Sequence, residues 1–99
     1  MMRYKVIVNP ISGRGNGEKS IPLIQNLLEQ HGLSHDLVRT ERPGHAIELA
    51  QQAAVAGYDV VVAAGGDGTA NEVLNGLMQA KQAGAEAAMG VLCVGRGND

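Results

Sequence analysis

The sequence predicts an α/β domain in which four parallel strands alternate with three helices that cover both faces of the sheet. Three observations support this prediction. Short runs of β-branched and aliphatic residues alternate with longer segments whose apolar residues recur at helical spacing. One run, Val60-Val61-Val62-Ala63-Ala64, is apolar without interruption, as is typical of a strand buried on both faces. Glycine-rich turns follow the first, third and fourth runs. We therefore expect a three-layer, doubly wound parallel sheet with the order β-α-β-α-β-α-β.

The first strand is expected at residues 4–8, a short apolar run with β-branched residues. Asn9-Pro10 ends it, because proline lacks an N–H and biases the residue before it away from a helix. Residues 12–17 contain three glycines and are predicted to form a loop. In the first helix, the side chains that recur at helical spacing are Ile21, Ile24, Leu27, Leu28 and His31.

The ends of this helix are marked by residues with known terminal preferences. Ser20 is the predicted N-cap, and Pro22 fits the first turn, where a missing N–H is tolerated. Gly32 is the predicted residue just past the last turn. A second strand is expected at residues 35–40, where polar and apolar residues alternate modestly.

The second helix is expected to open after Pro43-Gly44 and to end at Gly57. Its apolar face consists of Ile47, Leu49, Ala50, Ala53 and Ala54. A third strand at residues 60–64 leads through a glycine-rich loop into the third helix, whose apolar positions are Val73, Leu74, Leu77 and Met78. The fourth strand is expected at residues 89–94.

The composition excludes several classes of protein. With 44% hydrophobic residues and a formal net charge of −2 over 99 residues, the chain does not have the composition of a disordered protein. A nucleic-acid surface is not expected, because there is no basic excess and Tyr4 and Tyr58 are the only aromatic residues. No apolar run approaches the roughly 18 residues of a membrane span. Cys93, the single cysteine, cannot form an internal disulfide, which fits a cytoplasmic protein.

Two standard phosphate-binding patterns fail on the first glycine loop. Counted from Gly13, both the P-loop and the dinucleotide fingerprint require a glycine at the position that Glu18 occupies. A carboxylate there would face the phosphates that the loop should hold. Two interpretations remain open: a plain turn between strand and helix, or a loop in which Ser12 and free backbone N–H groups contact an anion.

The loop Gly65-Gly66-Asp67-Gly68-Thr69 joins the buried third strand directly to a helix. As local structure it predicts a capping box, with Thr69 as N-cap and Glu72 three residues later. As a binding site, its glycines would let phosphates approach the backbone at a helix N-terminus, which offers N–H donors. Asp67 would repel phosphate unless it holds Mg²⁺ or orders the loop, and a nucleotide with Mg²⁺ resolves this conflict. Direct coordination, coordination through water and loop ordering all remain open for Asp67.

Four motifs, in order along nearly the whole chain, resemble those of the diacylglycerol kinase catalytic domain family. They are Asn9-Pro10-Ile11-Ser12-Gly13, Thr40 followed by Gly44-His45-Ala46, Gly65-Gly66-Asp67-Gly68-Thr69 with Asn71-Glu72-Val73 and Asn75-Gly76, and Gly97-Asn98-Asp99. The glycine-aspartate loop alone is less specific, because NAD kinases and phosphofructokinases resemble it there. The opening Asn-Pro-x-Ser-Gly and the closing Gly-Asn-Asp favour the lipid kinases.

The resemblance implies ATP-dependent phosphorylation of a lipid hydroxyl, with ATP and Mg²⁺ bound by this chain and a lipid such as diacylglycerol as acceptor. Asp67 is the implied Mg²⁺ ligand. The implied nucleotide-binding residues are Asn9, Pro10, Ile11, Ser12, Gly13, Thr40, Gly66, Asp67, Gly68, Thr69, Ala70, Asn71, Glu72 and Arg96.

The end of the fourth strand departs from the family pattern, which usually reads Pro-x-Gly-Thr-Gly-Asn-Asp. Here Cys93 replaces the proline and Arg96 replaces the threonine. Arg96 either pairs with a phosphate through its planar guanidinium or is a solvated loop residue. Cys93 is expected to be a buried, small apolar residue.

The resemblance further implies that residues 1–99 form an N-terminal nucleotide-binding lobe, truncated at its C-terminus. No residue is assigned as a catalytic base, because the family takes its base and much of its acceptor site from a second, β-rich domain. We expect little or no activity from the chain alone, a cytoplasmic location with transient contact at the inner membrane face through the substrate, and no nucleic-acid partner. The oligomeric state stays open. The alternatives are an NAD kinase-like enzyme and a non-catalytic nucleotide-binding module.

Overall fold

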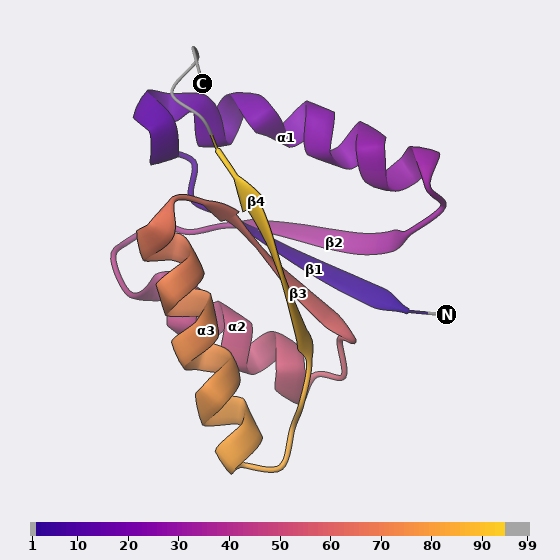
Figure 1. Ribbon diagram of the computed structural model, residues 1–99, viewed down its shortest axis with the longest axis vertical. Helices are drawn as coiled ribbons and strands as arrows, with labels where there is room; N and C mark the ends of the chain where they lie inside the picture. The colour runs from indigo at the N-terminus through magenta and orange to yellow at the C-terminus, as the bar shows by residue number, and fades with distance from the viewer. Residues whose placement is uncertain (1, 95–99) are drawn as a thin grey trace.

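The structure is a computed structural model that describes residues 2–94. Strands and helices follow one another in the predicted order (Figure 1). The elements are β1 (Arg3–Val8), α1 (Ser12–Gln30), β2 (Ser34–Arg39), α2 (His45–Val55), β3 (Val60–Gly65), α3 (Asp67–Gln82) and β4 (Ala88–Cys93). The four strands form one parallel sheet, which confirms the predicted α/β class and its doubly wound architecture.

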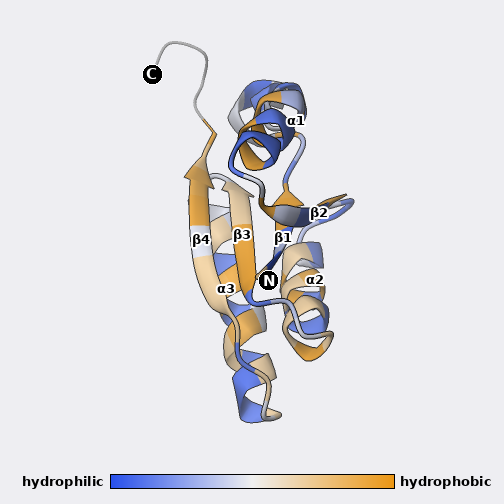
Figure 2. Cartoon of the chain, turned by 90° about the vertical axis from the view of Figure 1, so that its right-hand side faces the viewer, coloured by the Kyte–Doolittle hydropathy of each residue, from blue (hydrophilic) through white to orange (hydrophobic). Residues whose placement is uncertain are grey.

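The strand order is β2-β1-β3-β4, so β1 and β3 lie at the centre of the sheet. Helix α1 packs on one face, and α2 and α3 pack together on the other (Figure 2). The chain passes from β1 to β2 in one direction and then crosses back over β1 to reach β3. The winding direction therefore reverses between β1 and β3. In open α/β sheets, ligands bind at the carboxyl ends of the strands at such a reversal.

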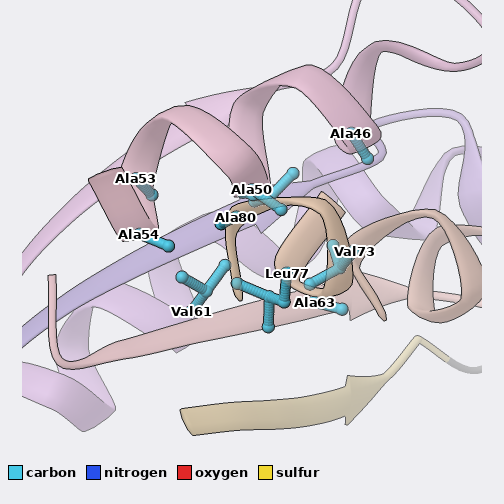
Figure 3. Close-up of a cluster of buried hydrophobic side chains, with 10 residues drawn as sticks. Ala46, Ala50, Ala53, Ala54, Val61, Ala63, Val73, Leu77 and Ala80 are labelled. Atoms are coloured by element: carbon cyan, nitrogen blue, oxygen red, sulfur yellow. The ribbon is translucent and has the colours of Figure 1, made fainter. Parts of the chain in front are cut away.

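Alternating side chains of the central strands build one apolar core on each face of the sheet. In β1, Ile7 belongs to the core beneath α2 and α3, whereas Val6 and Val8 belong to the core beneath α1. The core beneath α2 and α3 is rich in alanine, as Figure 3 shows, and small side chains let the two helices approach closely. Its alanines are Ala46, Ala50, Ala53, Ala54, Ala63 and Ala80.

The first glycine loop is more ordered than the sequence predicts. Ser12 already begins α1, and Gly13, Arg14 and Gly15 then form a left-handed turn with φ of 60°, 61° and 92°. The right-handed helix continues after this turn. The predicted loop is therefore a kink near the start of the helix, and glycines suit two of its three left-handed positions.

Ser20 is not the N-cap of this helix, which corrects the prediction. Its hydroxyl donates to the Asn16 carbonyl oxygen at 2.6 Å, from a position inside the helix. Pro22 consequently lies within α1 rather than in its first turn. Close packing favours the earlier start, because Gly17 lies so near the backbone at Asn9 that any side chain at position 17 would overlap the Asn9 carbonyl oxygen.

The predicted ends of α1 and α2 are confirmed at Gly32 and Gly57. Both have positive φ, 65° and 97°, a conformation that favours glycine. After α1, the Gly32 N–H donates to the Glu29 carbonyl oxygen at 3.0 Å, and the Leu33 N–H donates to the Leu28 carbonyl oxygen at 2.9 Å. This pair of hydrogen bonds is the Schellman motif, which satisfies carbonyl groups at the helix end.

Strand β4 is more exposed than its apolar sequence predicts. Val91 is 52% exposed, and Cys93 is exposed rather than buried, which corrects the prediction for this cysteine. The reason is that β4 forms one edge of the sheet, while α1 packs on β1, β2 and β3. An apolar groove of about 420 Å³ therefore lies between α1 and β4. Within residues 2–94, none of the helices has the length and apolar character needed to cross a bilayer.

Candidate functional site

A pocket of about 300 Å³ opens at the carboxyl edge of the sheet, where the winding direction reverses. The ends of β1 and β2 and the starts of α2 and α3 surround it. Its lining consists of Asn9, Pro10, Ile11, Thr40, Glu41, Arg42, Pro43, Ala46, Gly68, Thr69 and Glu72. The location is the one that the fold itself favours for a ligand.

The pocket brings together predicted nucleotide-binding residues from three separate segments of the chain. Those in the lining are Asn9, Pro10, Ile11, Thr40, Gly68, Thr69 and Glu72. Those that the lining does not include, although they adjoin it along the chain, are Ser12, Gly13, Gly66, Asp67, Ala70 and Asn71. The prediction for Arg96 falls outside the described residues.

Helix α3 begins at the pocket, with Gly66 as its N-cap in an extended conformation. The Ala70 N–H donates to the Gly66 carbonyl oxygen at 3.1 Å. Within residues 2–94, no acceptor is found for the preceding backbone N–H groups, those of Asp67, Gly68 and Thr69. Free N–H groups at a helix start, together with the helix dipole, attract anions.

The predicted capping box at the start of α3 is wrong. Thr69 is the third residue of the helix, only 5% exposed, and not its N-cap. The Glu72 carboxylate instead reaches α2, where Oε2 accepts from the Gly44 N–H at 3.2 Å and Oε1 from the Ala46 N–H at 3.3 Å. Glu72 therefore caps a neighbouring helix. A local pattern could not show this, because the two donors lie 28 and 26 positions away in the sequence.

Gly65, the last residue of β3, lets two hydroxyl groups approach its backbone closely. A Cβ at this position would lie 2.6 Å from Oγ1 of Thr69 and 2.9 Å from Oγ of Ser12. The Ser12 hydroxyl, which comes from the first glycine loop, therefore lies next to the start of α3. In this way the two glycine-rich segments meet although they are far apart in the sequence.

The chain segments around the pocket are tied to the strands by backbone hydrogen bonds. The Asn9 N–H donates to the Ala64 carbonyl oxygen at 3.0 Å, and the Thr40 N–H donates to the Val8 carbonyl oxygen at 2.8 Å. The Asn9 side chain adds a local bond, because its Oδ1 accepts from the Ile11 N–H at 3.2 Å. Asn9 and Thr40 thus occupy fixed positions at the ends of β1 and β2.

The turn between β2 and α2 supplies pocket residues that sequence reasoning missed. The Glu41 N–H donates to Nδ1 of His45 at 3.0 Å, which closes the turn at the first residue of α2. Arg42 pairs with Glu48 at 2.7 Å, and each side chain is about half exposed. The motif of Thr40 with Gly44-His45-Ala46 flanks this turn and was the available signal for it, although it assigned a binding role to Thr40 alone. The missed lining residues are Glu41, Arg42, Pro43 and Ala46.

A bidentate ion pair beside the pocket joins α1 to the end of β2. Arg39 donates to both carboxylate oxygens of Glu18, at 2.7 and 2.9 Å. These hydrogen bonds, and the positive charge behind them, lower the pKa of the Glu18 carboxyl group below its usual value. The hydrogen bonds to Glu18 and its negative charge raise the pKa of the Arg39 guanidinium.

The pocket lining contains charged side chains of both signs. Among the described residues of the lining, Arg42 is the only cation, and Glu41 and Glu72 are acidic. Residues 2–94 contain no group of three or more His, Cys, Asp or Glu side chains that could hold a metal ion. Mg²⁺ is commonly held by one or two carboxylates together with substrate phosphates. Asp67 fits this kind of site, because it is exposed and precedes Gly68 in the first turn of α3.

Comparison with known proteins finds relatives over nearly the whole chain. Residues 3–99 match the family model described as the diacylglycerol kinase catalytic domain. The chain is 38% identical over 99 residues to a diacylglycerol kinase of Bacillus subtilis (strain 168), covering 100% of this chain and 32% of that protein. A diacylglycerol kinase of Staphylococcus saprophyticus is 35% identical over 97 residues, covering 98% of this chain and 31% of that protein.

Solved structures give the same result for the fold. A crystal structure of a diacylglycerol kinase from Bacillus anthracis (strain Sterne) superposes with a TM-score of 0.71 at 26% identity, over 94% of this chain and 33% of that chain. A second crystal structure from the same strain gives a TM-score of 0.79 at 26% identity, with the same coverage of both chains. The chain spans about a third of the length of the curated relatives that it matches.

Proposed function

The chain belongs to the family of diacylglycerol kinase catalytic domains, and on this premise we propose that it is the ATP-binding part of a lipid kinase. One observation carries the proposal. The pocket at the winding reversal combines the free N–H groups at the start of α3 with residues from all three segments that the family resemblance implies for nucleotide binding. A fold that positions such groups at one edge is suited to phosphate recognition.

In the proposed complex, the nucleotide phosphates bind at the start of α3. The backbone N–H groups of Asp67, Gly68 and Thr69 donate to phosphate oxygens, and the nearby Ser12 hydroxyl is available as a further donor. The remainder of the nucleotide occupies the pocket toward Thr40.

Asp67 is the residue that would hold Mg²⁺, together with the phosphate oxygens. When bound, Mg²⁺ neutralises negative charge on the phosphates and on the phosphoryl group in transfer. Asp67 is exposed and beside Gly68, so its carboxylate can approach an ion carried by phosphates at the helix start.

The proposed reaction transfers the γ-phosphoryl group of ATP to a lipid hydroxyl. A bond forms between the hydroxyl oxygen and the γ-phosphorus, the bond from that phosphorus to the bridging oxygen breaks, and ADP leaves. The hydroxyl proton passes to a base. We place this base and the lipid site in the remainder of a longer kinase, because the chain spans about a third of its relatives. Residues 1–99 are then a nucleotide-binding lobe that has little or no activity alone.

Isothermal titration calorimetry of the 99-residue chain with ATP tests this proposal. We expect ATP to bind and Mg²⁺ to strengthen the binding. Asp67→Asn is expected to remove the strengthening by Mg²⁺, whereas Asp36→Asn, a matched change on β2, is expected to keep it. Absence of ATP binding with and without Mg²⁺ would contradict the proposal, as would an unchanged Mg²⁺ effect in Asp67→Asn.

A phosphorylation assay with labelled ATP tests the second part. We expect no turnover of diacylglycerol in mixed micelles by the chain alone, and none of NAD. Robust lipid turnover by the isolated chain would show that the base lies within these residues. Turnover of NAD instead would assign the chain to a different kinase activity.

A further inference from the structure

We infer that Glu72 is a positioning residue that closes the start of α2 to anions and thereby directs the phosphates to the start of α3. The inference rests on the proposed function, because it concerns the same pocket. Nucleotide binding was the role that family resemblance implied for Glu72. The contacts of its carboxylate point to a different one.

Helices α2 and α3 both begin at the wall of this pocket, so an anion there has two helix starts at which to bind. At α2, every one of the first backbone N–H groups has an acceptor. Glu72 accepts from Gly44 and Ala46, the His45 N–H donates to the Arg42 carbonyl oxygen at 3.1 Å, and the Ile47 N–H donates to the Gly44 carbonyl oxygen at 3.1 Å. At α3, the first three N–H groups have no acceptor within residues 2–94.

The charge of Glu72 reinforces this difference. A helix start carries a partial positive charge, which a carboxylate neutralises when it lies against the first N–H groups. An anion that approached the first N–H groups of α2 would therefore meet the negative charge of Glu72 and no free backbone donor. The start of α3 also has a carboxylate in its first turn, that of Asp67, but among the described residues this carboxylate accepts no hydrogen bond from the first N–H groups, so these donors stay free.

Close packing of the two helices explains why Glu72 faces α2. Gly76 lies four residues after Glu72, on the same side of α3. It contacts the backbone of α2 so closely that a side chain there would overlap the Ile47 carbonyl oxygen. Glu72, one turn nearer the pocket, is thus held opposite the first residues of α2. The two hydrogen bonds of Glu72 also fix the loop between β2 and α2, which forms one wall of the pocket.

An NMR titration of the isotope-labelled 99-residue chain with inorganic triphosphate tests the inference. In the wild-type chain, we expect the amide signals of Gly68 and Thr69 to shift and those of Gly44 and Ala46 to stay in place. In Glu72→Gln, a neutral side chain with one acceptor oxygen, the signals of Gly44 and Ala46 are expected to respond to triphosphate as well. Glu86→Gln, a matched change outside the pocket, is expected to give the wild-type map.

The outcomes separate this inference from the proposed function. Wild-type signals of Gly68 and Thr69 that do not respond would contradict the proposed function and this inference with it. If they respond but Gly44 and Ala46 respond equally in the wild-type chain, only the inference fails. It also fails if Glu72→Gln merely weakens binding without any new response at Gly44 and Ala46, since that is what a purely structural role predicts.

Hydrogen exchange of the wild-type chain gives a second test that does not depend on the folding of a variant. The amides of Gly44 and Ala46 are expected to be protected before any anion is added, and those of Gly68 and Thr69 are expected to gain protection only with triphosphate. Equal exchange rates at the two helix starts in the anion-free chain would overturn the inference.

Discussion

The Thr69 hydroxyl lies in the space that a side chain on Gly65 would need, with its Oγ1 only 2.6 Å from the position of a Cβ there. Gly65 ends the central strand β3, and Thr69 belongs to the first turn of α3. Their close approach therefore sets the tight connection between strand and helix. The same gap admits the Ser12 hydroxyl from the first glycine loop, at 2.9 Å.

Gly65→Ala is expected to displace these two hydroxyl groups and to weaken ATP binding by about tenfold or more. The added methyl group should also lower the free energy of unfolding by roughly 1–3 kcal/mol, as overpacking in a dense region does. Calorimetry with ATP and urea denaturation measure the two effects. For stability, Gly66→Ala is the control, because no atom lies within 4 Å of a Cβ at that position, and a change within about 0.5 kcal/mol is expected. Wild-type ATP affinity in Gly65→Ala would refute the role given to the Gly65 backbone.

Gly76→Ala tests the contact between α2 and α3. Helix propensity alone would favour alanine by about 1 kcal/mol. The new Cβ would overlap the Ile47 carbonyl oxygen and lie 2.8 Å from Cβ of Ala50, so steric overlap should dominate and destabilise the chain. We expect a lower urea midpoint, with a loss of roughly 1–3 kcal/mol. A midpoint at or above that of the wild-type chain would show that the helices can separate at little cost.

The Glu18–Arg39 pair predicts a pH dependence in the acid range. Because the pair lowers the pKa of Glu18 in the folded chain, its contribution to stability is present above the unfolded pKa, about 4.3, and is lost as pH falls through the lower, folded pKa. Carboxyl NMR titration should find the pKa of Glu18 in the folded chain below its unfolded value. In Glu18→Gln, the free energy of unfolding should fall less steeply as the pH is lowered. Glu29→Gln, also in α1, should show the same pH dependence as the wild-type chain.

Tyr58 predicts a pH dependence at the alkaline end. Its hydroxyl donates to the Asp36 carboxylate, and this hydrogen bond, followed by desolvation, raises the pKa of the phenol. The contribution to stability is therefore complete below the unfolded pKa, about 10, and is lost as pH rises through the higher, folded pKa. Tyrosinate absorbance should show one late-titrating tyrosine that disappears in Tyr58→Phe. If Tyr4→Phe removes the late step instead, the assignment to Tyr58 is wrong.

Features carried by local sequence could be predicted well. Apolar runs and helical spacing gave the number, type and order of the elements, and Gly32 and Gly57 marked two helix ends, because only glycine adopts positive φ there without strain. The glycine-rich loops also indicated the sheet edge where the pocket lies. Each of these signals depends on neighbouring residues in the chain.

Features that depend on tertiary contacts could not be predicted in this way. Glu72 was expected to cap its own helix, but close packing of α3 on α2 gives it donors from another helix. Ser20 resembled an N-cap, although packing of Gly17 on Asn9 allows the helix to begin earlier. Cys93 was expected to be buried, yet an apolar strand at a sheet edge stays exposed.

Mapping the amide NMR signals of the 99-residue chain during titration with ATP and Mg²⁺ tests most directly whether this pocket binds a nucleotide. The largest shifts are expected at Gly68 and Thr69, with further shifts at Ile11 and Thr40 across the pocket. Shifts confined to the groove between α1 and β4, or no shifts at all with saturating ATP and Mg²⁺, would contradict nucleotide binding at the start of α3.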